Sequence, residues 1–417
     1  MHRVRQSLPY FAEAGWEAVT LAVDPEYVEG YRDEHLLETI AEAADVRRLP
    51  ALDYHWTRRL GLGSVALRSL WAYRRAGNAL LARGDIDLVY FSTTAFQVLV
   101  LGRYWKARFG VPYVIDMQDP WRSDHYLSVP PDERPPKFWL SYLLDSLLEP
   151  VTMHGVDGIV SVSQGYCDTL QGRYPNIRPD MCRVIPFGGA EADFDVLDRL
   201  DLDNPFFRPD DAYTNVVYVG RGGHDMARAG AALFDALAAG RRERPDLFER
   251  VRMHFIGTDY AAEGHGAKTF QPLAEARGVG AFVAEYPARV PYFTALHLLR
   301  QADMLVLPGS ADPAYTASKL YPYILARRPL LAVFNERSSV VDVLRETGAG
   351  ETVTFRAEQG ADLGERVKTA WASLLGRLPD PPDTNWAAFE PYTARAMTRR
   401  QTAFFDEVVN GRAGEPT

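Results

Sequence analysis

Strand-like and helix-like segments alternate along almost the whole chain, and this alternation constrains the fold more than any other feature. The strand-like runs are rich in β-branched and aromatic residues, and helical patterns lie between them. These runs cover residues 17–24, 86–93, 111–121, 158–163, 214–223, 251–259, 281–287 and 303–310. Such alternation is typical of parallel sheets covered by helices, so we predict an α/β protein.

The length of the chain predicts two domains. With 417 residues it exceeds what one hydrophobic core usually serves. Residues 183–195 resemble a strand followed by a glycine turn, and the stretch from there to about residue 209 is rich in Asp, Asn and Pro, as linkers are. We therefore expect one doubly wound domain over residues 1–195 and a second over residues 210–387.

Composition excludes several classes of protein. The formal net charge of −9 argues against a general nucleic-acid-binding or anionic-lipid-binding surface. The two cysteines, Cys167 and Cys182, have no metal-site spacing, so we expect neither a disulfide scaffold nor a structural zinc. No apolar run approaches the roughly 18–20 residues of a membrane span. These features predict a soluble, cytoplasmic protein.

The first residues read directly as a helix, "HRVRQSLPYFAEAG", although a doubly wound domain needs a first strand in the middle of its sheet. Its loss would expose unpaired strand edges. We therefore expect an upstream strand and glycine-rich turn before Met1. The alternative is an atypical fold without that strand.

The glycine-rich run after the strand at 214–219 is one candidate ligand site, because open α/β sheets bind ligands beyond the carboxyl ends of their strands. It contains Gly220, Arg221, Gly222 and Gly223. Glycines let backbone amides approach a phosphate, and the arginine can pair with phosphate oxygens. The alternative is an ordinary glycine turn.

A second candidate anion site lies in "YTASKLYPYILARRPLLAV", residues 315–333. A helix that begins near Ser318 or Lys319 has Pro322 in its first turn, where a missing amide costs little. Amides of residues 317–319, the Ser318 hydroxyl and the Lys319 ammonium would then form a diphosphate cradle. The alternative is a serine cap beside a solvated lysine. The presence of the Arg221 loop favours the cradle.

Two carboxylates, Asp116 and Asp119, follow the strand at 111–117 and could orient an acceptor hydroxyl or act as a base. Alternatively, Asp119 only starts a turn, because Asp-Pro pairs commonly do so. We find no metal-ligand cluster, nucleophile elbow or Walker A loop.

These segments resemble bacterial family-4 glycosyltransferases of the GT-B fold, in particular their envelope-polysaccharide branch. The similarity covers nearly the whole chain. It is carried by "RVRQSLPYFAEAGWEAVTLAV", "FGVPYVIDMQDPW", "GIVSVSQGY", "VYVGRGG" and "SKLYPYILARRPLLAV". The closing helical stretch, about residues 388–411, resembles the crossover that returns to the first domain.

The resemblance implies two Rossmann-like domains that face each other across a cleft, with a nucleotide-sugar in the second domain and the acceptor in the first. It implies anomeric retention and no metal or other cofactor. Tyr286 and Val290 stand where the family wraps the nucleotide base. We assign donor binding to the residues Gly220, Arg221, Gly222, Gly223, Tyr286, Val290, Thr316, Ser318 and Lys319, and catalysis to Asp116, Asp119, Arg221 and Lys319.

The chain departs from the family in three places. The paired glutamates of the donor helix correspond to Tyr315 and Pro322, neither of which is acidic. A basic residue of the donor loop is replaced by Met226, with Arg228 as the nearest substitute. Glu336 and Asp342 are the closest acidic candidates for holding the ribose.

Our first hypothesis is a glycosyltransferase of polysaccharide biosynthesis that moves a sugar from a nucleotide-sugar to a saccharide or lipid-linked acceptor. The alternative is a degenerate, non-catalytic GT-B protein that binds a nucleotide or glycan, or that serves as a scaffold; a sugar epimerase is a third option. The mixed basic and aromatic segment "RYWKARF", residues 103–109, predicts peripheral contact with the inner face of the membrane, or else a packed helix with a solvated edge.

Overall fold

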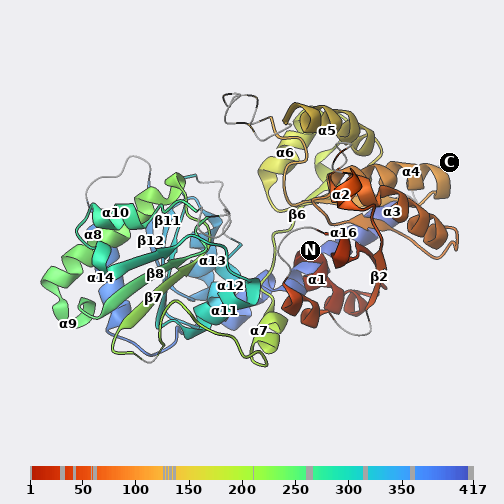
Figure 1. The fold of residues 1–417 in the computed structure, drawn as a ribbon. Helices are drawn as coiled ribbons and strands as arrows, with labels where there is room; N and C mark the ends of the chain where they lie inside the picture. The colour runs from red at the N-terminus through yellow and green to blue at the C-terminus, as the bar shows by residue number, and fades with distance from the viewer. Residues whose placement is uncertain are drawn as a thin grey trace. The chain divides into compact units, whose positions relative to one another are not determined.

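The computed structural model describes residues 2–28, 33–40, 44–57, 59, 63–124, 127, 130, 134, 138–209, 211–259, 266–312, 318–356 and 362–411. Its strands pair in parallel and alternate with helices, so the α/β prediction is confirmed. The chain divides into two compact units (Figure 1). Unit 1 contains residues 1–32, 40–187 and 395–417, and unit 2 contains residues 33–39 and 188–394.

The strands of unit 1 form two separate parallel sheets. One pairs β1 with β2, and the other has the order β3-β4-β5-β6. The strands are β1 Val19–Val23, β2 Asp45–Leu49, β3 Val89–Phe91, β4 Tyr113–Met117, β5 Gly158–Ser161 and β6 Cys182–Val184. β4 and β5 are buried along their whole length because helices cover them, as parallel strands require.

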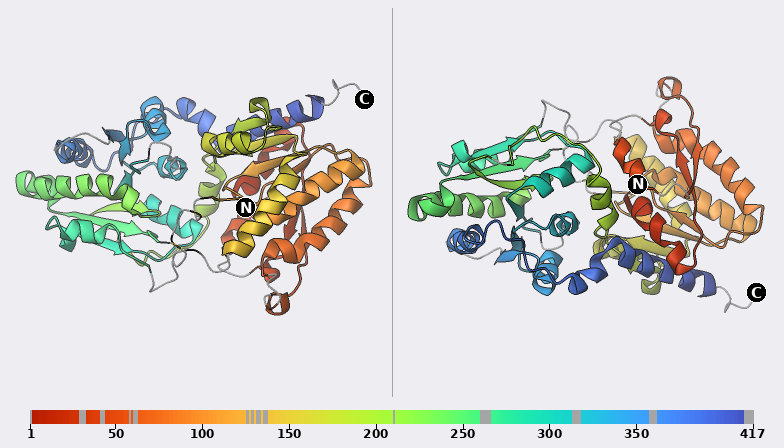
Figure 2. Two further views of the ribbon diagram at one scale, coloured as in Figure 1. Left: turned by 90° about the horizontal axis from the view of Figure 1, so that it is seen from above. Right: turned by 90° about the horizontal axis from the view of Figure 1, so that it is seen from below.

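The helices of unit 1 include the C-terminal helix, which packs against the N-terminal segment. Phe405 contacts Phe11 and Tyr90, with ring centroids 6.4 and 4.9 Å apart. Figure 2 shows this helix in blue beside the red N-terminal segment. The helices are α1 His2–Ser7, α2 Tyr54–Thr57, α3 Val65–Leu81, α4 Val100–Phe109, α5 Phe138–Met153, α6 Gln164–Arg173 and α16 Ala394–Gly411.

Unit 2 has one six-stranded parallel sheet of order β12-β11-β10-β7-β8-β9. Its strands are β7 Thr214–Val219, β8 Val251–Ile256, β9 Val283–Tyr286, β10 Met304–Pro308, β11 Leu330–Asn335 and β12 Glu351–Phe355. The chain proceeds outward through β7, β8 and β9 and then restarts at β10 on the other side of β7. The sheet therefore has a topological switch point between β7 and β10, where α/β proteins bind ligands.

Nine α-helices are found among the described residues of unit 2. They are α7 Glu191–Leu197, α8 Ala227–Glu243, α9 Pro245–Phe248, α10 Gln271–Glu275, α11 Tyr292–Gln301, α12 Leu320–Leu325, α13 Ser339–Thr347, α14 Leu363–Leu375 and α15 Trp386–Phe389. In the described part of the chain, no helix combines the length and the apolar character needed to cross a membrane.

The glycine turn predicted before residue 195 is wrong in its second half, because residues 191–197 form α7. Phe194, Val196 and Leu197 of that helix are buried in the core of unit 2, as is Phe207 in the stretch predicted as a linker. The main segment of unit 2 accordingly begins at Gly188. Packing on a distant sheet decides this helix, and its short apolar pattern does not reveal that contact.

Candidate functional site

The loop after β7 lies at the switch point and leaves no room for side chains at its glycines. A Cβ on Gly220 would lie 2.3 Å from Nζ of Lys319, and one on Gly222 would lie 2.2 Å from Oγ1 of Thr269. Gly220 also has φ +155°, a conformation that L side chains rarely adopt. The loop therefore needs glycine both for its backbone and for the close approach of Lys319.

Lys319 and the Arg221 loop, predicted separately from the sequence, meet at Tyr218. Nζ of Lys319 donates to the Tyr218 hydroxyl at 3.0 Å, and that hydroxyl donates to the carbonyl oxygen of Arg221 at 2.7 Å. The ammonium also lies 5.2 Å from the centroid of the Tyr218 ring. Tyr218 is fully buried in β7, so a rigid strand fixes this junction.

The environment of Lys319 lowers the pKa of its ammonium group. Burial of the ammonium, with a smaller contribution from the nearby Arg221 guanidinium, lowers the pKa of Lys319 to about 7, against a partial opposing effect of Asp225. A cation desolvated in this way gains from an incoming anion, which would restore its charge.

Arg221 is held in place by Asp225. Its Nη1 and Nη2 donate to the two carboxylate oxygens at 3.1 and 2.8 Å. This pairing lowers the pKa of the Asp225 carboxyl. Asp225 is also fixed through its backbone, because its carbonyl accepts from the amide of Ala311 after β10 at 2.8 Å. The exits of β7 and β10 are thereby tied together.

The helix that follows Lys319 begins where the sequence predicted. Its N-cap is Lys319 and its first residue is Leu320, so Pro322 falls in the first turn. The hydroxyl of Tyr323 accepts from the amide of Val219 at 2.7 Å and donates to the carbonyl of Val219 at 3.1 Å. Tyr323 thus fixes α12 to the end of β7, next to the glycine loop.

The buried carboxylate of Glu285 stabilises the segments that contact the glycine loop. Glu285 of β9 accepts from the hydroxyl of Thr258 at 2.7 Å and from the backbone amides of Thr269, Phe270 and Gln271 at 2.7–3.0 Å. The carbonyl of Thr258 in turn accepts from the amide of Gly222 at 2.7 Å. Glu285 therefore connects the start of α10 with the glycine loop after β7.

Sequence reasoning missed Tyr218, Tyr323 and Glu285. A signal exists for the first, since a tyrosine inside an aliphatic strand must find a partner for its hydroxyl. Glu285 lies in a run predicted as a strand, and a carboxylate that is buried in such a strand needs several hydrogen-bond donors. Which donors these are depends on contacts between segments distant in sequence.

The other predicted donor residues lie around this centre. Tyr286 and Val290 lie close to Gly257. The amide of Gly257 donates to the carbonyl of Tyr286 at 2.8 Å, and a Cβ on Gly257 would lie 3.9 Å from the amide nitrogen of Val290. The Tyr286 ring packs on Phe206 at 4.9 Å. Ser318 is exposed. Thr316 and the neighbouring residues 315 and 317 lie outside the described residues.

Met226, which stands at the place of a basic family residue, and the candidate substitutes Arg228, Glu336 and Asp342 all have other surroundings. Met226 is fully buried, and the guanidinium of Arg228 lies 5.3 Å from the centroid of the Phe355 ring. Glu336 pairs with Arg356 at 2.6 Å. Asp342 pairs with Arg345 at 2.9 Å.

Asp116 and Asp119 have different environments in unit 1. Asp116 is buried, and its Oδ2 accepts from Arg3, Ser92 and Gln118 at 2.6–2.9 Å. Its Oδ1 has no hydrogen-bond partner in the described part of the chain. Asp119 is exposed. Asp116 therefore joins α1 to the sheet through Arg3, and Asp119 is the accessible carboxylate of the two.

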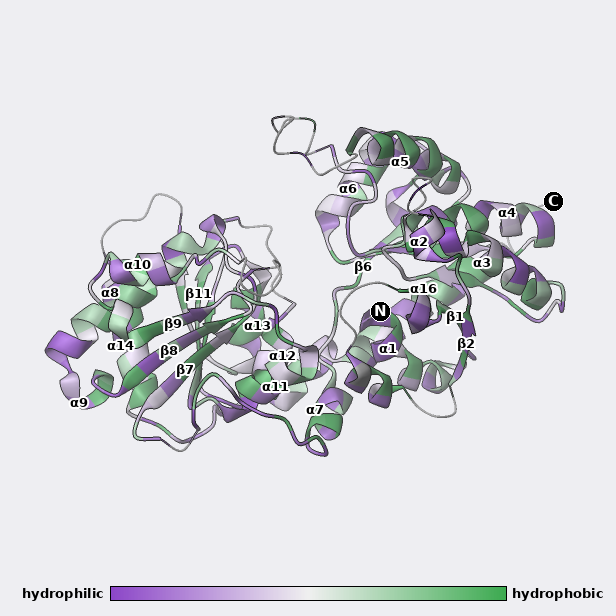
Figure 3. Cartoon of the chain, viewed as in Figure 1, coloured by the Kyte–Doolittle hydropathy of each residue, from purple (hydrophilic) through white to green (hydrophobic). Residues whose placement is uncertain are grey.

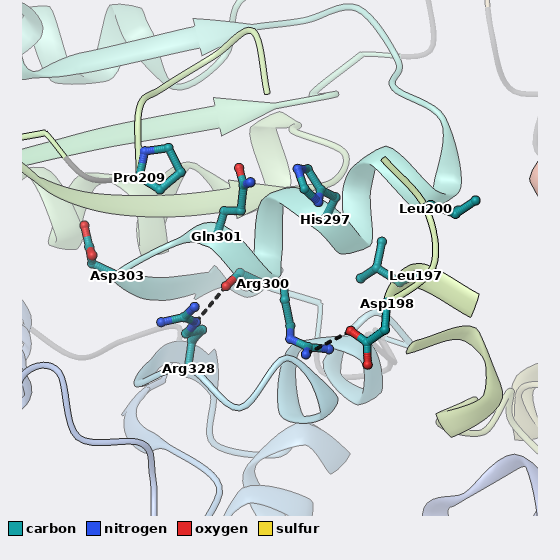
Figure 4. Close-up of a pocket in the computed structure, with 9 residues that line it drawn as sticks. All are labelled: Leu197, Asp198, Leu200, Pro209, His297, Arg300, Gln301, Asp303 and Arg328. Carbon is teal, nitrogen blue, oxygen red and sulfur yellow. Dashed lines mark hydrogen bonds and ion pairs between the residues drawn. The ribbon is translucent and has the colours of Figure 1, made fainter. Parts of the chain in front are cut away.

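A cavity of about 410 Å³ lies at the opposite edge of the unit 2 sheet, near residues that precede β10 and β11 (Figure 4). Two arginines in it already have partners. Arg300 pairs with Asp198 at 3.1 Å, and Nε of Arg328 donates to the carbonyl of Arg300 at 2.8 Å. Because the residues predicted to bind the donor lie at the carboxyl edge of the sheet, this cavity is not the predicted donor site.

No group of three or more His, Cys, Asp or Glu side chains is placed to hold a metal ion within the residues that the structure describes. The groups of this site that could bind an anion are Arg221, Lys319 and the backbone of the glycine loop.

The first part of the chain matches a known family. Residues 2–188 match the family model described as a glycosyl transferase 4-like domain. A search of curated proteins gives no match. The family match confirms the predicted resemblance over these residues.

Three solved structures of similar fold cover nearly the whole chain. Anabaena HepE in complex with UDP and glucose is 13% identical, with 97% of this chain and 94% of that chain covered and a TM-score of 0.52. Sucrose-phosphate synthase from Thermosynechococcus elongatus is 14% identical, with 98% and 93% covered and a TM-score of 0.52. A glycosyltransferase from Rickettsia africae is 12% identical, with 98% and 94% covered and a TM-score of 0.51. The chain therefore has the GT-B fold, as predicted.

Proposed function

We propose that this chain, which has the GT-B fold and a glycosyl transferase 4-like domain over residues 2–188, transfers a sugar from a nucleotide-sugar donor. The acceptor is a saccharide or a lipid-linked glycan, the location is the cytoplasm, and the reaction proceeds with retention and without a bound metal. The structure of HepE holds UDP and glucose, which supports a uridine nucleotide as the first donor to test.

One observation carries this proposal: Arg221 and Lys319 converge at the switch point of the unit 2 sheet. Tyr218 contacts both, and the two cations belong to segments about a hundred residues apart in the chain. Two cations and a glycine backbone at such a place suit a diphosphate.

The residues of the chain would act on the leaving group. An ammonium has three donors, so the contact of Lys319 with Tyr218 leaves capacity for phosphate oxygens. Asp225 orients the Arg221 guanidinium, and the negative charge that develops on the departing diphosphate is stabilised by both cations. Asp119, the exposed carboxylate after β4, is our candidate for orienting the acceptor.

A non-catalytic nucleotide- or glycan-binding protein is the second candidate. It is favoured by Pro322, which lies in the first turn of α12 at the place of a family glutamate. Donor turnover distinguishes this candidate from the transferase.

The first test is thermal unfolding of the full chain with UDP, GDP, ADP, CDP and dTDP. A diphosphate that binds only the folded protein at about 100 times its dissociation constant adds about 2.7 kcal/mol to the free energy of unfolding. We expect one diphosphate to raise the melting temperature, and Arg221→Ala or Lys319→Ala to abolish the shift. If all five leave it unchanged, both donor binding and the proposed transfer are wrong.

Binding should also take up a proton at mildly alkaline pH. With a pKa of about 7, only about one tenth of Lys319 is protonated at pH 8, and a bound diphosphate that raises this pKa above 9 would draw in about 0.8 proton. Calorimetry in two buffers of different ionisation enthalpy measures this uptake. Lys319→Arg should bind without it, and wild-type binding with zero uptake would contradict the site.

A further inference from the structure

Helices α3, α4 and α5 of unit 1 form one layer. Asn78 of α3 bonds to Trp105 and Tyr104 of α4, at 3.0 and 3.2 Å. Lys106 of α4 donates to the carbonyl of Gly155, just after α5, at 2.8 Å. The three helices lie side by side in both views of Figure 2. Their outward side chains therefore belong to one surface.

The part of this surface on α5 is apolar. Leu140 and Leu143 are 57% exposed, Trp139 is 59% exposed and Leu147 is 61% exposed, with Val151 less so. Trp139, Leu143, Leu147 and Val151 recur every four residues, so they form a row along one side of the helix. Figure 3 shows most of α5 in the colour of hydrophobic residues. Single exposed apolar residues are ordinary, but a row of this kind marks a contact surface.

The part of the surface on α3 and α4 is basic. Arg74, Arg75, Arg103 and Arg108 are exposed, and neither helix contains an acidic residue. Arg75 lies against the ring of the exposed Trp71, 5.6 Å from its centroid.

The two acidic residues of α5 offset only part of this charge. Asp145 accepts hydrogen bonds from Trp121 and Gln97, and Glu149 is fully buried with Arg173. The layer is thus locally positive on a chain of net charge −9.

The segment predicted from the sequence for membrane contact supplies only part of this surface. Trp105 of "RYWKARF" is buried and stacks on Phe91, with ring centroids 5.9 Å apart. Arg103 and Arg108 point outward from the same helix. Trp105 of that segment therefore belongs to the core, and the exposed apolar side chains of the proposed surface come from α5.

We propose that the outer face of α3, α4 and α5 docks on an anionic lipid bilayer. An exposed row of leucines with a tryptophan suits the boundary between head groups and acyl chains, and arginines beside it suit lipid phosphates. Charge complementarity selects this occupant over a second copy of the chain. In a two-fold dimer the same positive face would meet itself.

Docking in this way would bring the acceptor edge of unit 1 near the bilayer. α5 follows the loop that leaves β4, so its Trp139 end lies at the carboxyl edge of the sheet, where Asp119 is found. This consequence rests on the proposed function in its lipid-linked form. The docking itself does not, because vesicle binding is measured without donor or turnover.

The test is sedimentation of the full chain with vesicles of phosphatidylcholine alone or of phosphatidylcholine with phosphatidylglycerol. We expect salt-sensitive binding to the anionic vesicles only. Arg75→Glu with Arg108→Glu should weaken it at least about tenfold, since each basic residue near such a surface contributes about a factor of five. Leu143→Ser with Leu147→Ser, which changes no charge, should weaken it to a similar extent.

The matched control is Arg242→Glu with Arg345→Glu, the same charge change at exposed positions of unit 2; it should bind as the wild type does. All variants should retain the wild-type melting temperature, because the replaced side chains are exposed. Equal binding to both kinds of vesicle, binding to neither, or a dimer that the leucine variant dissociates would each overturn the proposal.

Discussion

Lys319→Ala is expected to lower kcat/KM for donor turnover about 100- to 1,000-fold, the usual loss when one group that stabilises a developing anion is removed. Lys319 meets the Arg221 loop through Tyr218, so its replacement by alanine removes one of the two cations that converge there. Arg221→Ala should have an effect of similar size. The double variant should cost less than the product of the two, because both act on the same diphosphate.

The pH dependence of the melting temperature distinguishes a catalytic role of Lys319 from a structural one. The pKa of Lys319 is lowered in the folded chain from 10.5 to about 7, so the folded state is penalised most below pH 7 and the penalty fades as pH rises toward 10.5. Lys319→Met should therefore raise the melting temperature at pH 6, although it lowers turnover as Lys319→Ala does. The control is Arg242→Met, which removes a well-exposed cation of α8 and should leave both the melting temperature at pH 6 and turnover unchanged. Full activity in Lys319→Met would refute the proposed site.

Glu285→Gln is expected to lower the free energy of unfolding of unit 2 by about 3 kcal/mol or more. Both carboxylate oxygens accept hydrogen bonds, one from Thr258 and Thr269 and the other from the amides of Phe270 and Gln271. A glutamine amide turns one of these acceptors into a donor, which leaves buried N–H or O–H groups unsatisfied at about 1–3 kcal/mol each. Denaturant unfolding followed through the transition of unit 2 measures the loss.

Glu275→Gln makes the same chemical change at an exposed position of α10 and should cost less than about 0.5 kcal/mol. Glu285→Gln should also weaken diphosphate binding, since Thr258 holds the amide of Gly222. A loss of stability below about 1 kcal/mol would mean that the network around Glu285 relaxes without it.

Much of the fold could be predicted because its signals are local. A run such as residues 214–219 reads as a buried strand from its own side chains, and Pro322 limits where a helix can begin. Residues 191–197 show the limit of such reasoning. Their helix is stabilised by burial in the core of unit 2, which no local pattern reports.

Residue type and spacing were enough to specify the α/β class, the glycine loop after β7 and the presence of Arg221 and Lys319. The folded chain was needed to show that the two cations meet at Tyr218, that Glu285 supports their loop, and that Asp116 is bound to Arg3 while Asp119 is exposed. Strand order brings residues a hundred positions apart to one edge of a sheet, and the hydrogen bonds of a buried polar group depend on which neighbours that order supplies.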